Sequence, residues 1–252
     1  MLKGFYNLTS GMLSQSRRLN VVGTNMTNIS TPGYKAETYT DIPFDQVLYS
    51  RVGNKTDRRG QEIGEESYIL APDQLYVDYT EGIPEETGLP LDFAIQGDGF
   101  FAVETEDGVL YTRNGSFSVD NEGYLILGHY GRVLSSRGEP IYLATDNIRA
   151  DSSGALYLND GAAYAGPIGV FAFQDNGQLT VHPNGLFDAN GQAAAAVENP
   201  TLMWKCVERS NVEMIDAMTE MMTSQRALQG AAQVVKMYDG LLTKATSDLG
   251  RV

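Results

Sequence analysis

Few side chains of this sequence have the types and spacing that catalysis or metal binding requires. His129 and His182 are the two histidines, and neither has a cysteine or carboxylate partner at the spacing of a metal site. Cys206 is the single cysteine and lies beside Trp204, so we interpret it as a small core residue without an internal disulfide. The sequence has no P-loop, no dinucleotide-binding glycine motif and no G-x-S-x-G nucleophile turn. We therefore expect no enzyme, no metal and no cofactor.

Two groups of polar residues resemble partial calcium loops: D-N-E-G-Y-L from Asp120 and D-A-N-G-Q from Asp188. Neither has the carboxylate count or the twelfth-position glutamate of an EF-hand loop. Aspartate, asparagine and glycine are also the residues that tight turns need, because they tolerate left-handed backbone. We favour hairpin turns. A carboxylate pair for glycoside hydrolysis stays open as an alternative among the many acids, but no spacing selects one pair.

The net charge of −14 is distributed unevenly along the chain. Residues 1–35 carry four basic groups and no acid, residues 36–206 carry −17, and residues 207–252 carry −1. The acidic middle argues against a nucleic-acid partner, since binding to phosphates needs a cationic surface. No stretch of about twenty apolar residues predicts direct membrane insertion, and no secretory signal peptide is recognisable. We expect a protein that is cytosolic or exported without a cleavable signal.

The first thirty residues show a heptad pattern of apolar side chains. One row recurs every seven residues and a second row follows three residues later; together they are Phe5, Leu8, Met12, Leu19, Val22, Met26 and Ile29. Such a pattern predicts a helix that packs along another helix. Thr31-Pro32-Gly33 ends it, because proline disfavours helix in the residue before it. Three glycines inside the pattern each cost about 1 kcal/mol of helix propensity, so the helix needs a partner.

The C-terminal segment has the same period. Its large apolar positions are Met214, Met221, Leu228, Val235, Leu242 and Leu249, and the row three residues later is mostly small: Ala217, Ser224, Ala231, Tyr238 and Ala245. Ser210-Asn211-Val212-Glu213 fits a capping box at the start of a helix of about 39 residues. We predict that the two terminal helices pair as in a coiled coil. Two ordinary core helices of a globular domain are the alternative.

Between the termini, short alternating runs and turn signals predict strands. Residues 93–105 are interpreted as two strands hinged by Gly97-Asp98-Gly99, and residues 108–127 alternate in the manner of a sheet, with turns at Asn114-Gly115 and Asp120–Gly123. The predicted fold class is α+β, with paired terminal helices around a central all-β domain of short strands and hairpins. We assign residues 1–35 and 207–252 to a helical assembly domain, 36–89 to an extended connector, and 90–206 to an all-β outer domain.

The stretch T-N-M-T-N-I-S-T-P-G-Y-K, residues 24–35, resembles the N-N-L-A-N-x-x-T-P-G-Y-K motif of the flagellar rod and hook proteins. The closing stretch from Ser210 resembles the family's S-N-V…Q-R-A-Y-E helix, although Leu228-Gln229 replaces Tyr-Glu. Residues 95–103 and 111–126 are similar to its internal region. The matching motif positions are Asn25, Asn28, Thr31, Pro32, Gly33, Tyr34, Lys35, Ser210, Asn211, Val212, Gln225, Arg226 and Ala227.

This resemblance implies a structural subunit of the flagellar basal-body rod that polymerises through its terminal helices into the drive shaft for motility. The short length favours a rod protein over the hook subunit. The implied partners are copies of itself, other rod and hook proteins, and the flagellar type III export apparatus. The alternatives are a hook-type axial protein, and a β domain that binds cell wall or ring components with the helices as a dimerising stalk.

Overall fold

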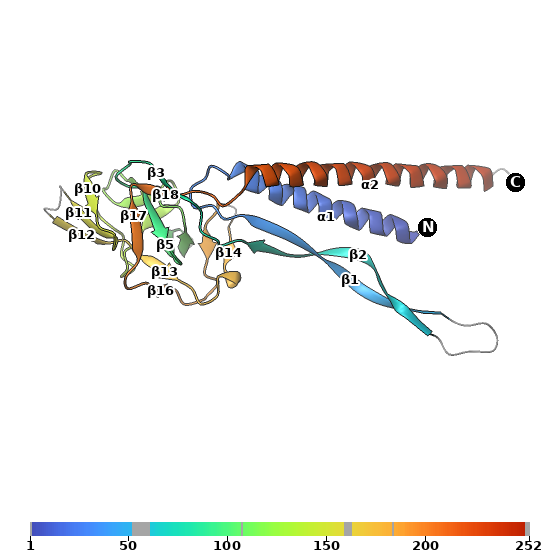
Figure 1. Cartoon of the computed structure of the whole chain (residues 1–252), viewed down its shortest axis with the longest axis horizontal. Helices are drawn as coiled ribbons and strands as arrows, with labels where there is room; N and C mark the ends of the chain where they lie inside the picture. Colours follow the sequence, from blue (N-terminus) through green and yellow to red (C-terminus); the bar gives the residue numbers. More distant parts are fainter. Residues whose placement is uncertain (1, 52–60, 107, 159–162, 183, 250–252) are drawn as a thin grey trace. The chain divides into compact units, whose positions relative to one another are not determined.

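The computed structural model describes residues 2–51, 61–106, 108–158, 163–182 and 184–249 (Figure 1). The chain divides into two compact units, each built from segments far apart in the sequence. The helical unit comprises Met1–Met26, Glu37–Tyr76 and Met214–Val252, and the β unit comprises Thr27–Ala36 and Val77–Glu213. Residues 36–89, expected as a connector, are thus divided between the two units.

The helical unit contains two helices and a long pair of strands. α1 (Leu2–Thr27) and α2 (Met214–Leu249) run in opposite directions within it (Figure 1). β1 (Glu37–Arg51) and β2 (Gln61–Val77) form a two-stranded sheet within the region that sequence reasoning assigned to an extended connector. Among the described helices, none has the length and apolar character to cross a membrane.

α2 begins at Met214, later than the capping box predicted. The Ser210 hydroxyl accepts a hydrogen bond from the Val212 N–H at 3.3 Å, in the segment that precedes the helix. Ser210 therefore shapes the turn before α2 and does not cap the helix. At a rise of 1.5 Å per residue, the 36 residues of α2 span about 54 Å.

The β unit is built from short strands. The first eight are β3 (Pro84–Glu86), β4 (Phe93–Gln96), β5 (Phe100–Thr105), β6 (Gly108–Thr112), β7 (Ser118–Val119), β8 (Leu125–Leu127), β9 (Gly131–Val133) and β10 (Ile148–Ala150). The rest are β11 (Ala155–Leu158), β12 (Ala163–Pro167), β13 (Val170–Ala172), β14 (Thr180–Val181), β15 (Phe187–Asp188), β16 (Ala195–Ala196), β17 (Thr201–Trp204) and β18 (Cys206–Glu208). The largest sheet has the order β14-β15-β6-β5-β9-β8-β7, with β13 and β16 joined to it through β5.

β5 lies at the centre of this sheet and is covered on both faces. Phe101 and Val103 point into one apolar cluster, while Phe100 and Ala102 point into a second. All four side chains are at most 1% exposed, which explains why this strand is almost continuously apolar. β5 pairs with β6 and β9, and both pairings are antiparallel. The predicted α+β class with a central β-rich region is confirmed.

The asparagine- and aspartate-rich stretches form turns. Asp120–Gly123 connects β7 to β8, with the Gly123 N–H donating to the Asp120 carbonyl at 2.9 Å. In the second stretch, the Asp188 carboxylate accepts from the backbone N–H of Asn190 at 2.9 Å. Asn190 itself has a φ of 52°, in the left-handed region. These residues stabilise the backbone of the turns, as expected for hairpins.

Candidate functional site

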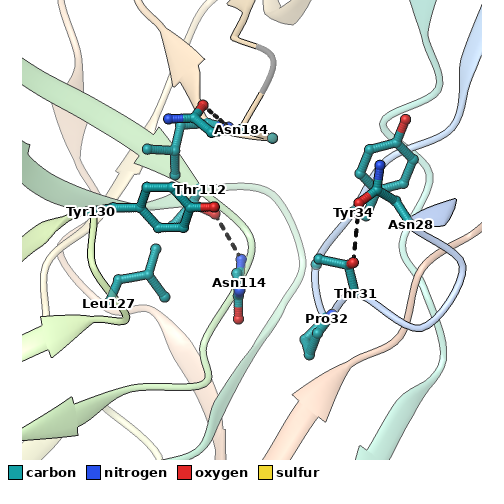
Figure 2. Close-up of a pocket in the computed structure, with 12 residues that line it drawn as sticks. Asn28, Thr31, Pro32, Tyr34, Thr112, Asn114, Leu127, Tyr130 and Asn184 are labelled. Carbon is teal, nitrogen blue, oxygen red and sulfur yellow. Dashed lines mark hydrogen bonds between the residues drawn. The ribbon is translucent and has the colours of Figure 1, made fainter. Parts of the chain in front are cut away.

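The loop that follows α1 is held tightly inside the β unit. Gly33 has a φ of +67°, and its N–H donates to the Glu208 carbonyl at 2.7 Å. A Cβ at this position would lie 2.2 Å from the carbonyl carbon of Arg113. Only glycine therefore fits, both by conformation and by space. The Thr31 hydroxyl donates to the Asn28 side-chain oxygen at 3.2 Å and orders the turn before Gly33 (Figure 2).

Three charged side chains meet in the interior of the β unit. The Lys35 ammonium lies 2.6 Å from one oxygen of the Glu208 carboxylate, and an Arg113 guanidinium nitrogen lies 3.3 Å from the other. The side chains of Lys35, Glu208 and Arg113 are 1%, 2% and 4% exposed. Desolvating such charges is costly, so each depends on its partners.

Backbone groups add further hydrogen bonds to this cluster. Lys35 also donates to the Thr80 carbonyl at 2.6 Å, and Arg113 donates to the Gly97 carbonyl at 2.8 Å. The Gly82 N–H donates to the Glu208 carboxylate at 2.9 Å. Burial lowers the pKa of Lys35, while its hydrogen bond to Glu208 and the charge of that carboxylate act in the opposite direction. The cluster thus connects segments that are distant in the sequence.

Asn211 makes a second connection beside the ion cluster. Its side-chain oxygen accepts from the Ala36 N–H at 2.7 Å, and its amide nitrogen donates to the Asp78 carbonyl at 2.8 Å. The asparagine thereby bridges the loop that follows α1 and the segment that follows β2. We call Gly33, Lys35, Arg113, Glu208 and Asn211 together the linker anchor.

The helical unit contains a comparable set of polar contacts, which connect α1 to β1. The Asn25 amide donates to the Glu37 carbonyl at 2.7 Å and accepts from the Glu37 N–H at 3.0 Å, tying the last turn of α1 to the start of β1. The Ser14 hydroxyl donates to Asp41 at 2.6 Å, and Arg18 lies 3.5 Å from the same carboxylate. Burial also raises the pKa of Glu37. α1 and β1 are therefore connected at three positions along the helix.

A small cavity lies between the motif loop and the sheet. Asn28, Pro32 and Tyr34 line one side, while Asn114 and Tyr130 line the other (Figure 2). Its volume of about 30 Å³ is far below the roughly 300–1,000 Å³ of a small-molecule site. This part of the motif loop accordingly packs against the sheet and offers no ligand pocket.

The predicted positions on α1 differ in exposure. Val22 is buried at 3%, and Phe5 is 43% exposed. The half-buried predicted positions are Leu8, Met12, Leu19 and Met26 on the helix, and Ile29, which lies beyond its end. Buried and half-buried positions include a line with 4-3 spacing through Gly4, Leu8, Gly11, Gln15, Arg18, Val22 and Asn25, and Ser14 beside it is buried as well. Two of these positions are glycine, so the backbone of α1 is open to close approach there.

On α2 the row of small residues is the most buried. Ala217 and Ser224 are 8% and 3% exposed. Half-buried positions continue the same spacing at Met221, Leu228, Ala231, Val235 and Tyr238. Met214 and Leu242 are exposed, and the side chain of Leu249 lies outside the described residues. A Cβ on Gly4 would lie 3.1 Å from the Tyr238 hydroxyl, so α1 and α2 are in contact there.

Each helix also carries a second, exposed apolar row. On α2, Ile215, Met218 and Met222 are 78%, 47% and 52% exposed. At 100° per residue these side chains lie roughly 100–180° around the helix from Ala217 and Ser224, outside the buried face. On α1, Tyr6 and Leu13 are 58% and 54% exposed. We call these five side chains the outer row.

The motif positions take different roles. Gly33, Lys35 and Asn211 belong to the linker anchor, whereas Gln225, Arg226 and Ala227 are exposed on α2. Tyr34 is buried, and Asn28, Thr31, Pro32, Ser210 and Val212 are half-buried. Sequence reasoning missed Arg113 and Glu208 as site residues. The one signal was that both lie in or beside stretches with motif character.

Three family models match separate parts of the chain, and all describe flagellar axial proteins. The flagella basal body rod protein model matches residues 5–35, the flagellar hook protein FlgE/F/G D1 domain model matches 94–189, and the flagellar basal body rod FlgEFG protein C-terminal model matches 206–248. The fold and these matches define a flagellar rod or hook protein.

Similarity to curated proteins extends over the whole chain. The flagellar basal-body rod protein FlgG of Bacillus subtilis (strain 168) is 30% identical over 96% of this chain and 97% of its own length. The flagellar hook-basal body complex protein FlhO of the same strain is 29% identical over the full length of both. FlgF of Mesorhizobium japonicum is 29% identical over 99% of each chain.

The chain belongs to the flagellar basal-body rod protein family. It is a structural protein of the bacterial flagellar basal body and not an enzyme.

Proposed function

We propose that this rod subunit polymerises through α1 and α2, with two apolar faces on each helix that have different partners. The inner faces pair α1 with α2 as in a coiled coil, over the predicted positions from Leu8 to Met26 and from Met221 to Val235. The outer row contacts helices of neighbouring subunits. The observation that carries this proposal is the outer row itself, since it is an apolar stripe left exposed in the single chain.

The size of the outer row suggests weak single contacts. A fully buried apolar side chain contributes about 1.5–3 kcal/mol, so covering the exposed half of five such side chains contributes roughly 4–8 kcal/mol. This is at most about a micromolar association before the cost of immobilising the subunit is included. A pair of subunits is therefore unstable alone, while a subunit with several neighbours in a polymer is held firmly.

The other assignments follow from family membership. We propose other rod and hook proteins as the neighbours along the axis, and the type III export apparatus as the route out of the cell. The helical unit has few deeply buried side chains on either helix among the described residues. Low burial suits helices that are unfolded during export and become ordered on assembly, with neighbour contacts offsetting the ordering entropy.

A pair of aspartate substitutions tests the proposal. Leu228→Asp places an unpaired charge on the inner face, and Met222→Asp places one on the outer row. Thr223→Asp is the matched control, because Thr223 is exposed and points to neither face. We expect both test variants to lose incorporation into purified basal bodies and to lose motility, while Thr223→Asp keeps both.

The two test variants separate the two faces. Met222→Asp should leave the helical content of the free subunit unchanged, since its side chain is 52% exposed there. Leu228→Asp should reduce the helical content of the free subunit. Full motility of both variants would overturn the proposal.

A further inference from the structure

The last strands before α2 pair with the first strands of the β unit. β17 pairs with β4, aligning Trp204 with Phe93, and β18 pairs with β3, aligning Val207 with Glu85. By contrast, β5–β6, β7–β8 and β8–β9 connect neighbours in the sequence. The β unit therefore combines local hairpins with longer-range pairings, and among the described strands β17–β4 and β18–β3 join the segments of the unit that are furthest apart in sequence.

The linker anchor adds further long-range contacts at the same place. Lys35 and Glu208 are separated by 173 residues, and Ala36 and Asn211 by 175. Arg113, which belongs to the central sheet region, reaches the same carboxylate. All three charged side chains are nearly inaccessible to water, so their pairing is favourable only in a cage whose other walls already exist.

Lys205 lies between β17 and β18 and lets these two consecutive strands pair with different partners, β4 and β3. Its φ of 61° lies in the left-handed region, which an ordinary side chain rarely adopts. Its N–H donates to the Asp92 carbonyl at 2.8 Å, and its carbonyl accepts from the Thr87 N–H at 2.9 Å. At Lys205 the chain therefore stops pairing with β4 and starts pairing with β3, and the backbone N–H and carbonyl of this residue are both hydrogen-bonded.

Close backbone approach accompanies this segment. A Cβ on Gly82 would lie 1.9 Å from the Arg209 carbonyl oxygen, so residue 82 must be glycine for the chain to pass. This contact between Gly82 and Arg209 is rigid once the two segments have packed. Before they pack, it gives little stabilisation.

We propose that residues 201–211 are a closing latch that forms last when the β unit folds. Closing a loop of more than 170 residues costs more chain entropy than closing a hairpin, and that cost precedes the contacts that offset it. The local hairpins form first, and the latch adds β17, β18, Glu208 and Asn211. The β unit consequently stays open until the chain is complete as far as Asn211. Folding of the β unit is therefore completed only when both the loop that follows α1 and the segment that precedes α2 are present.

Folding and unfolding rates of the full-length chain test this order. Asn211→Ala removes the bonds to Ala36 and Asp78, and Lys35→Met removes one cation of the cluster. Val103→Ala, in the fully buried centre of β5, is the comparison in the central sheet. Trp204, the single tryptophan, supplies the fluorescence signal.

We expect Asn211→Ala and Lys35→Met, the two variants that remove latch contacts and are called latch variants below, to unfold at least about tenfold faster and to fold within about twofold of the original rate. Val103→Ala should instead slow folding severalfold. The proposal is overturned if Asn211→Ala slows folding as strongly as Val103→Ala, or if neither latch variant changes the unfolding rate. If Lys35→Met does not fold, Asn211→Ala alone decides, because it creates no buried unpaired charge.

Discussion

Replacing Glu208 by glutamine should destabilise the β unit strongly, although the two side chains have the same shape. In the structure the carboxylate accepts from Lys35 at 2.6 Å, from the Gly82 N–H at 2.9 Å and from Arg113 at 3.3 Å. Glutamine removes the single negative charge of this cluster. It leaves two cations buried without an anion.

The expected magnitude follows from that uncompensated charge. Removing one partner of a buried ion pair typically costs about 3–5 kcal/mol. For a denaturant slope of about 1–3 kcal/mol per molar urea, this shifts the unfolding midpoint down by roughly 1–5 M. Urea titration of the full-length chain, followed through Trp204 fluorescence, measures the shift in the unit that contains the cluster.

Glu85→Gln is the matched control for this substitution. Glu85 lies on β3, which pairs with the strand that carries Glu208, and its ion pair with Arg209 at 3.4 Å is about 60% exposed. We expect it to change stability by less than about 0.5 kcal/mol. A loss of under about 1 kcal/mol for Glu208→Gln would refute the reasoning, because the charges would then be shown to be solvated or redundant.

Further substitutions test other parts of the structure. Gly33→Ala should destabilise the β unit by roughly 1–3 kcal/mol in urea titration, because its Cβ collides with the Arg113 backbone, whereas Gly128→Ala, with φ +51° and no neighbour within 4 Å, should lose less. Burial and the charge of Asp175 raise the pKa of Tyr79 to about 12, so its contribution to stability is complete below pH 10 and is lost as the pH rises towards 12. The urea midpoint of Tyr79→Phe should therefore fall less between pH 9.5 and 11.5 than that of the original chain; equal slopes would contradict this. Amide exchange of the free subunit at low concentration should be faster in α1 and α2 than in β5, and strong protection of both helices would contradict the low burial of their side chains.

The sequence was most informative where the contacts are local and repetitive. Period-seven spacing predicted both terminal helices, and Asp120–Gly123 was recognised as a hairpin turn because its residues serve the turn backbone directly. The short apolar run around Phe101, bounded by Gly97-Asp98-Gly99, predicted a strand for the same reason, since residues close in the sequence decide it.

Arg113 and Glu208 of the linker anchor were out of reach of that reasoning, whereas Gly33, Lys35 and Asn211 were found as motif positions. Nothing near Glu208 in the sequence indicates that it is buried, because its partners Lys35 and Arg113 are 173 and 95 residues away. A buried charge is recognised only when its partner is known, and that partner is set by the tertiary fold. The pairing of β1 with β2 was missed in part because residues 36–89 mix charges and prolines without a clear alternating pattern.

Site-specific photo-crosslinking in assembled basal bodies tests the proposed outer row most directly. A benzophenone side chain placed at Met218, and at Thr223 as the control, reports what covers each side of α2. We predict crosslinks from position 218 to α1 or α2 of another subunit and none from position 223. Crosslinks from position 218 only within its own chain, or none at all, would contradict it.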